Sequence, residues 1–367
     1  MAQLSLTRRD ARRIAVLAQR FDRDRPAGLL ELVRHITLLQ IDATAAIAPN
    51  AHLVAWSRLG SRYDPAELGR ALRERELVEY RATIRPAEDM ALYGAQMAVW
   101  PGAGPLRDWQ KEIRAWVQAN DACRRDILRR LSESGPLTSR ELPDTCAVAW
   151  RSTGWTNNRN VTQLLEFMVG RGEVAVAGRS ANVRLWDVAE RVYPDVPPVP
   201  LEDAERLRND RRLAALGIAR SRGSACRIER LDVGEAGMEA VVEGVRGTWR
   251  VAPSLLDRPF AGRAALLSPF DRLLHDRKRA AELFEFDYSL EMYKPAASRR
   301  WGFFALPILY QDRLVGKLDA AADRRAGDLR VNAIHWDVEP TRAMTAAVDR
   351  ELRDLARWLE LGVAQAA

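Results

Sequence analysis

Apolar and polar positions recur with helical spacing in the first part of the chain. Thr7 and Asp10 form a capping pattern in front of one apolar helical face, and a second helix is predicted from Pro26. A third helix is predicted over 65–74, and 77–84 alternates as a strand does. Helices followed by a strand and a turn predict a helix-turn-helix unit with a wing.

The pattern is clearer in the next part of the chain. A helix is predicted over 124–134, a second over 137–142 and a third over 160–170. Two alternating strands follow, at 173–177 and 183–187. Three helices and a two-stranded ribbon are typical of a winged helix.

After a proline-rich linker the same order partly repeats. A helix is predicted over 205–216, and strands are predicted at 238–242 and 248–251. The remainder is predicted to hold three further strands and a closing helix, at 303–309, 314–318, 329–336 and 342–361. This last part is typical of a small α+β domain.

The chain is therefore predicted to be mainly α with small β-ribbons, an α+β fold of several parts. We expect winged-helix units at 1–118, 119–196 and 197–258, the first with the candidate catalytic motif, and an α+β domain at 259–367.

Composition narrows the class of protein. The 367 residues include 47% apolar and 29% charged side chains, and no apolar run is long enough for a membrane span or a signal peptide, so we expect a cytoplasmic address. A net charge of +7 is a weak indication of a nucleic-acid partner. The three cysteines and four histidines show no metal-binding spacing, so neither a metal nor a cofactor is expected.

Two parts of the sequence carry a family resemblance. The first is 38–42, Leu-Leu-Gln-Ile-Asp, with 52–60 after it; the second runs through 266–279 to Leu-Val-Gly-Lys-Leu-Asp at 314–319. Together they resemble the winged-helix alkyl-DNA glycosylases related to AlkZ and YcaQ, in the same order over almost the whole chain.

The resemblance implies three tandem winged-helix units around a concave channel. It also implies a catalytic Gln-apolar-Asp motif, which Gln40, Ile41 and Asp42 match in the version of the YcaQ branch. The chain departs from that branch at 79–86, where an aromatic residue, a histidine and a glutamate are usual.

The chemistry of alkylated purines suits such a motif. Alkylation at N7 of guanine or N3 of adenine makes the base cationic, so it leaves without a general acid. One carboxylate, Asp42, would stabilise the sugar cation and activate water, and Gln40 would hold the water or the sugar. No lysine lies in the motif, so a monofunctional enzyme is expected. The expected partner is double-stranded DNA with alkylated bases, bound by a monomer, and an open channel would also admit bulky adducts such as interstrand crosslinks.

The spacing has a geometric requirement. Side chains at positions i and i+2 share a face on an extended segment but not on a helix. Gln40 and Asp42 therefore point together only if the helix ends before them, and Ile41 is then expected to face the core. Without the resemblance, a Gln-x-Asp after an apolar helix is usually a cap and turn.

Further residues are candidates for DNA contact. They are His52, Ser57, Arg58, Arg159, Arg179, Asn182 and Arg184. The alternatives are a buried imidazole for His52, a structural ion pair for Arg58 and solvated charges for the wing arginines. The mixed charges of 271–279 favour an internal salt-bridge network over a bare DNA patch.

Two rival functions stay open. A non-enzymatic winged-helix DNA-binding regulator would explain the charge and the helical units without chemistry. A family member that has lost catalysis would explain the departures around Tyr80. Base excision from DNA carrying a charged lesion separates an enzyme from both.

Overall fold

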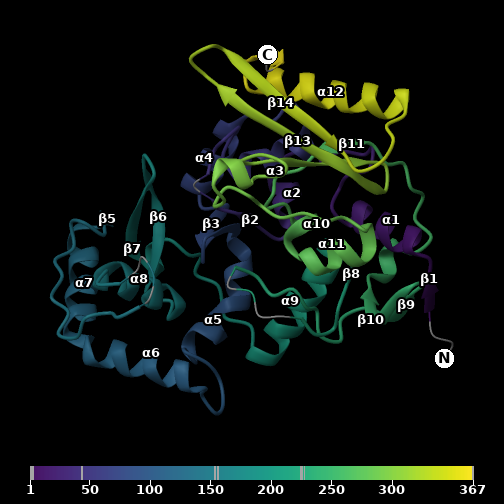
Figure 1. The fold of residues 1–367 in the computed structure, drawn as a ribbon. Helices are drawn as coiled ribbons and strands as arrows, with labels where there is room; N and C mark the ends of the chain where they lie inside the picture. Colours follow the sequence, from purple (N-terminus) through teal and green to yellow (C-terminus); the bar gives the residue numbers. More distant parts are fainter. Residues whose placement is uncertain are drawn as a thin grey trace. The chain divides into compact units, whose positions relative to one another are not determined.

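The computed structural model describes residues 4–42, 44–152, 154, 157–223, 226 and 228–365. The chain forms two compact units (Figure 1). Unit 1 consists of Met1–Leu68 and Asn209–Ala367, and unit 2 is the uninterrupted stretch Gly69–Arg208. Unit 1 is therefore built from two separated parts of the sequence. Each unit is described by itself below.

Unit 2 consists of helices packed on antiparallel strands. Its strands lie in the order β4-β3-β6-β7-β5. The strands are β3 (Leu77–Tyr80), β4 (Thr83–Pro86), β5 (Leu137–Thr138), β6 (Val174–Ser180) and β7 (Val183–Val188). The helices are α5 (Ala91–Ala98), α6 (Asp108–Ala119), α7 (Asp121–Ser134) and α8 (Asn160–Gly170). Their core contains Leu131, Leu164, Leu165 and Trp186.

Two predicted elements of unit 2 are wrong. The single strand expected at 77–84 is a hairpin, because Arg81 and Ala82 adopt left-handed backbone conformations and turn the chain between β3 and β4. The helix expected at 137–142 is the short strand β5 and a turn. The Thr138 hydroxyl does donate to Glu141, as at a helix start, but Pro143 follows too soon for a helix to continue.

The predicted order of helices and ribbon otherwise holds. Helix α7, helix α8 and the hairpin β6–β7 lie where the periodicity placed them. The identification of these elements as winged-helix units, their division into consecutive domains and the concave channel stay predictions.

Unit 1 contains a four-stranded sheet, β1-β9-β10-β8. Its strands are β1 (Leu4–Leu6), β8 (Ile218–Ala219), β9 (Met238–Val242) and β10 (Val245–Val251). Helix α1 (Arg8–Ala18) starts at the predicted Thr7 and Asp10 capping box. Its buried residues Ile14 and Leu17 belong to one core with Trp249 of β10 and with Leu213 of α9 (Leu201–Leu216). The N-terminus is thereby built into the third predicted segment, which the sequence pattern did not suggest.

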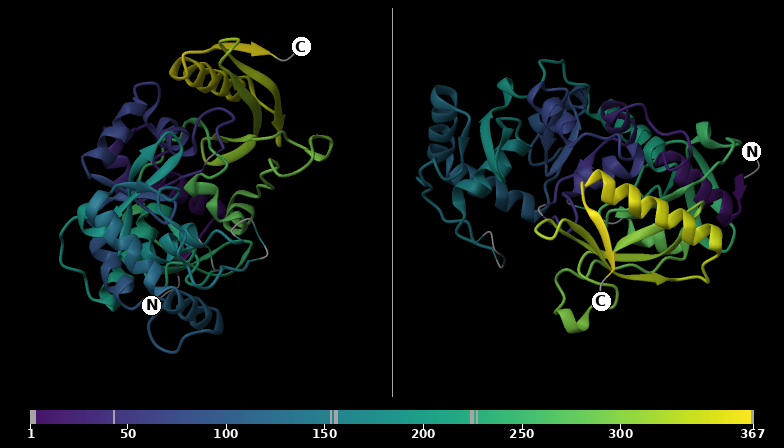
Figure 2. Two further views of the ribbon diagram at one scale, coloured as in Figure 1. Left: turned by 90° about the vertical axis from the view of Figure 1, so that its left-hand side faces the viewer. Right: turned by 90° about the horizontal axis from the view of Figure 1, so that it is seen from above.

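A second, five-stranded sheet of unit 1 has the order β11-β12-β13-β14-β15. Its strands are β11 (Ala264–Leu266), β12 (Leu306–Tyr310), β13 (Arg313–Asp323), β14 (Asp328–Trp336) and β15 (Gly362–Gln365). Helix α12 (Arg342–Trp358) lies along this sheet and contacts β11, β12 and β15 (Figures 1 and 2). The helices α10 (Arg272–His275) and α11 (Arg277–Phe284) follow β11. The predicted C-terminal strands and closing helix are therefore present.

The segment that carries the Gln-apolar-Asp motif lies between two helices of unit 1. Helix α2 (Leu29–Ile36) ends at Thr37, whose φ of 70° is left-handed, and the short strand β2 (Leu39–Gln40) follows. Helix α3 (Asn50–Leu59) begins after Pro49, and α4 (Pro65–Arg73) lies where it was predicted. Among the described residues, no helix is both long and apolar enough to cross a bilayer.

Candidate active site

Gln40 and Asp42 lie on an extended segment, as the spacing requires. Helix α2 ends four residues before Gln40, so the motif is not helical. Both polar side chains are partly exposed. Ile41 is also only partly buried, and the neighbouring Leu38 and Leu39 fill the core in its place. Leu38 and Leu39 are thus the buried apolar residues next to the motif, and the expectation that Ile41 faces the core stays a prediction.

The backbone of the motif is held by a chain of two buried side chains. The Asn50 amide donates from Nδ2 to the Gln40 carbonyl at 2.6 Å, and the Ser268 hydroxyl donates to Asn50 Oδ1 at 2.5 Å. Asn50 has no exposed surface and Ser268 has 1%. Both the nitrogen and the oxygen of the buried Asn50 amide are hydrogen-bonded, so this side chain has one orientation. Asn50 and Ser268 together therefore hold the backbone of Gln40 in place.

The carboxylate of Asp42 makes one local contact and has a second oxygen left. Its Oδ1 accepts a hydrogen bond from the backbone N–H of Thr44 at 2.8 Å, the geometry of an Asx turn. The hydroxyl of Thr44 lies 3.7 Å from the sulfur of Met292. Among the described residues, no hydrogen bond or ion pair reaches Oδ2 of Asp42, and the side chain is partly exposed.

The loop after Asp42 forms part of a cavity of about 470 Å³ in unit 1. Ala46 lines this cavity and accepts a hydrogen bond through its carbonyl from the N–H of Ala322 in β13. The other lining groups include the aromatic rings Trp301 and Phe303 and the polar residues Arg299, Arg300, Asp319, Asn332 and His335. Burial raises the pKa of Asp319, although Asn332 donates to its Oδ2. A cavity with aromatic and charged walls is therefore lined by the chain four residues after Asp42, at Ala46.

His52 is a partly buried imidazole next to aromatic rings. Its Nδ1 and the hydroxyl of Tyr63 form a hydrogen bond of 2.9 Å, and Tyr63 stacks on Trp358 of α12. Burial lowers the pKa of His52, so the imidazole is neutral near pH 7. This placement fits the buried-imidazole alternative.

Arg58 and Ser57 lie in the core and not at a surface. Arg58 is fully buried, donates to the carboxylate of Asp271 and lies 3.9 Å from the ring centroid of Phe21. The Ser57 hydroxyl donates to the carbonyl of Val54. Side chains without exposed surface reach no phosphate in this structure, so we assign Arg58 to the structural ion pair and exclude both residues from the DNA contacts.

The remaining predicted DNA contacts lie in unit 2, on the ribbon β6–β7 and before α8. Arg179 donates from two nitrogens to the buried carboxylate of Glu79. Burial raises the pKa of Glu79, and the Arg179 guanidinium counteracts this shift. Arg184 pairs with Glu166 at 2.5 Å. Both wing arginines therefore have carboxylate partners within unit 2.

Asn182 and Arg159 are exposed. Asn182 lies at the turn between β6 and β7, and Arg159 directly precedes α8. Arg179 is exposed as well, although it also pairs with Glu79.

Three polar residues around the motif were not predicted. Asn50 and Ser268 hold the Gln40 backbone, and Asp319 lines the neighbouring cavity. Ser268 and Asp319 lie within the two stretches that carry the family resemblance, which was the available signal. In the part of the chain that the structure describes, no group of three or more His, Cys, Asp or Glu side chains lies close enough to bind a metal ion.

The chain is similar to known proteins both in sequence and in fold. The family model described as "DNA glycosylase AlkZ-like" matches residues 33–358. Among solved structures, the DNA glycosylase AlkZ of Streptomyces sahachiroi has a similar fold, with a TM-score of 0.66. The alignment covers 99% of this chain and 100% of that one at 18% sequence identity. The similarity of fold therefore extends over both units.

Proposed function

The chain belongs to the AlkZ-like family of DNA glycosylases, and on this premise we propose that it hydrolyses the N-glycosidic bond of cationic alkylated purines in double-stranded DNA. The proposed substrates are 7-alkylguanine and 3-alkyladenine, and the reaction starts base excision repair in the cytoplasm. The observation that carries this proposal is the placement of Gln40 and Asp42 on a partly exposed, non-helical segment, four residues before the chain lines a cavity at Ala46.

Asp42 is the proposed catalytic carboxylate. A cationic purine needs no protonation to leave, so the barrier lies in the oxocarbenium-like sugar and in the attack of water. The Asp42 carboxylate stabilises the sugar cation and takes a proton from water at Oδ2, while Oδ1 is held by the Thr44 N–H. Gln40 orients the water or the sugar, and its backbone is fixed through Asn50.

The proposed enzyme is monofunctional and acts as a monomer. A lyase reaction needs an accessible lysine for a Schiff base. Lys317 lies on β13, the strand that also carries the cavity residue Asp319, but it is buried and pairs with Asp337 at 2.7 Å, so it supports no such role. Asn182 and Arg159 are the proposed DNA contacts of winged-helix unit 2, and His52 is a proposed wall of the channel.

The direct test uses a DNA duplex that carries a single 7-methylguanine. After incubation with the protein, alkali cleaves any abasic site, and a denaturing gel shows cleavage at the lesion. We expect one product of the predicted length and no cleavage of the lesion-free duplex. Binding of either duplex without cleavage would support the regulator or an inactive family member and would overturn this proposal.

A further inference from the structure

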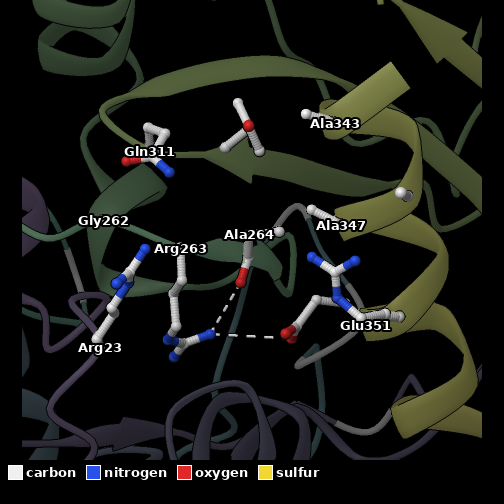
Figure 3. Close-up of a pocket in the computed structure, with 11 residues that line it drawn as sticks. Arg23, Gly262, Arg263, Ala264, Gln311, Ala343, Ala347 and Glu351 are labelled. Carbon is white, nitrogen blue, oxygen red and sulfur yellow. Dashed lines mark hydrogen bonds and ion pairs between the residues drawn. The ribbon is translucent and has the colours of Figure 1, made fainter. Parts of the chain in front are cut away.

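A second cavity of unit 1 is lined by arginines and alanines (Figure 3). Its volume is about 450 Å³. The walls come from the turn at Arg23, from the segment before β11, from the end of β12 at Gln311 and from α12. Alanines of α12 form a small-residue floor at Ala343, Ala346 and Ala347. The motif residues Gln40 and Asp42 do not line this cavity.

The wall beneath Arg23 is fixed by backbone contacts. The Arg23 N–H donates to the carbonyl of Ala261 at 2.9 Å, and Gln311 N–H donates to the carbonyl of Arg263 at 3.0 Å. A side chain on Gly262 would meet the backbone of Gln311 at 2.8 Å, so only glycine permits this close approach. The cavity is thus preformed on this side.

Arg263 is the structural arginine of the cavity. Its guanidinium donates to the carbonyls of Asp22, Ala264 and Ser57 and lies 3.8 Å from the carboxylate of Glu351 (Figure 3). Burial and the neighbouring Arg25 lower the pKa of Arg263 to about 9.

The other two arginines of the cavity, Arg23 and Arg350, form no close ion pair among the described residues, although Arg350 also interacts electrostatically with Glu351. Both are exposed, and among the described residues neither has a carboxylate within ion-pair distance. The single carboxylate of the lining, Glu351, already faces Arg263 and also Arg25 at 3.6 Å. The cavity therefore has an excess of positive charge at its rim and room between the arginines.

We propose that this cavity binds a phosphate of the DNA backbone, with Arg23 and Arg350 as its cationic ligands and Gln311 as a neutral donor. The planar guanidinium group suits the oxygens of a phosphate because it donates from two nitrogens at once. DNA is the occupant because the family acts on it, and a duplex presents phosphates to an exposed rim without entering the cavity. The inference rests on DNA being the substrate and not on the catalytic role of Asp42.

The test measures binding of a lesion-free duplex by the double variant Arg23→Gln/Arg350→Gln as a function of salt. A matched control, Arg342→Gln/Arg353→Gln, removes the same charge from exposed positions outside the cavity, both on α12. We expect the double variant to lose about tenfold in affinity, as for charge-assisted contacts. The slope of log affinity against log salt should fall by about 1, and the control should change affinity less than threefold.

A second variant and a second ligand complete the design. Ala346→Glu places a carboxylate in the cavity and should weaken duplex binding in the same way. When the protein is saturating, every variant should still excise a lesion at the wild-type rate. If only the control pair lowers affinity, or if no variant does, the proposal is wrong. Calorimetry measures whether the protein binds free pyrophosphate. If the double variant loses this binding but keeps its affinity for the duplex, the cavity binds a small phosphate compound and the DNA assignment is overturned.

Because the duplex carries no lesion, these results do not depend on excision. A protein that binds through the cavity but fails to excise 7-methylguanine would overturn the proposed function alone.

Discussion

The guanidinium of Arg58 binds the carboxylate of Asp271 through two nitrogens, and neither side chain has any exposed surface. Arg58 comes from α3, and Asp271 caps the start of α10 by accepting from the N–H of Leu273. The pair therefore joins the two sequence stretches that carry the family resemblance. A second link between the same stretches, from Ser268 to Asn50, holds the Gln40 carbonyl.

We predict that breaking this pair destabilises unit 1. Asp271→Asn leaves the Arg58 guanidinium as an uncompensated buried charge, so the free energy of unfolding should fall by about 3–5 kcal/mol. Urea unfolding followed by circular dichroism measures it. Arg58→Met/Asp271→Leu removes both charges and should cost less than Asp271→Asn alone. The surface pair of Arg129 and Asp126 is the control, since Arg129→Met should leave the free energy of unfolding nearly unchanged. Equal losses in the buried and exposed pairs would contradict the structural role.

The catalytic role of Asp42 predicts a separation of binding from chemistry. Asp42→Asn should keep DNA affinity and lower the single-turnover rate of 7-methylguanine excision by about a hundredfold or more, as when a charge-stabilising group is lost. Gln40→Ala should lower it less. Asp24→Asn is a suitable control, because Asp24 is an exposed carboxylate of unit 1 outside the motif. Excision by Asp42→Asn at the wild-type rate would refute the mechanism.

The same mechanism predicts that the charge of the damaged base decides whether it is excised. With a carboxylate and no general acid, the site expels only a base that is already cationic, so 7-methylguanine and 3-methyladenine should be released. Uracil, 8-oxoguanine and undamaged bases should stay. Time courses on a panel of single-lesion duplexes test this, and an interstrand crosslink through N7 of guanine can be added to the panel. Efficient removal of uracil would show an acid group that the proposal lacks.

We predict that the free energy of unfolding depends on pH through His275. Burial, with Arg272 and Arg277 nearby, lowers the pKa of His275 from 6.5 to about 4. Between these values the unfolded state takes up a proton that the folded state does not, so the free energy of unfolding falls as pH falls from 6.5 towards 4. At pH 5 the loss is about 2 kcal/mol. Urea unfolding at pH 7 and pH 5 should show a smaller difference for His275→Gln, and an unchanged difference would contradict the assignment.

Local signals in the sequence predicted the elements that depend on neighbouring residues. The Thr7 and Asp10 capping box fixed the start of α1, and β9 has the predicted bounds of 238–242. The turn at Arg81 and Ala82 was missed because neither residue is a glycine or asparagine, which usually mark left-handed turns. The geometry of the motif required the helix to end before Gln40, and α2 ends at Ile36.

Contacts between distant residues could not be predicted. Asn50 and Ser268 are 218 positions apart, and no periodicity connects them. The burial of Arg58 was left open for the same reason, because its partner Asp271 lies far along the chain. The same limit applies to the parallel pairing of Leu4 in β1 with Ala240 in β9, which ties the N-terminus to a sheet formed mainly by residues after 217.

This interrupted course of unit 1 has a consequence during synthesis on the ribosome. Unit 2 emerges as one uninterrupted stretch, Gly69–Arg208, and can fold while translation continues. Helix α1 has emerged earlier, but its core partners Leu213 and Trp249 have not yet been made. Its apolar face, with Ile14 and Leu17, therefore stays without its core until the last third of the chain has left the exit tunnel. During that interval the apolar face of α1 is exposed to solvent on the nascent chain.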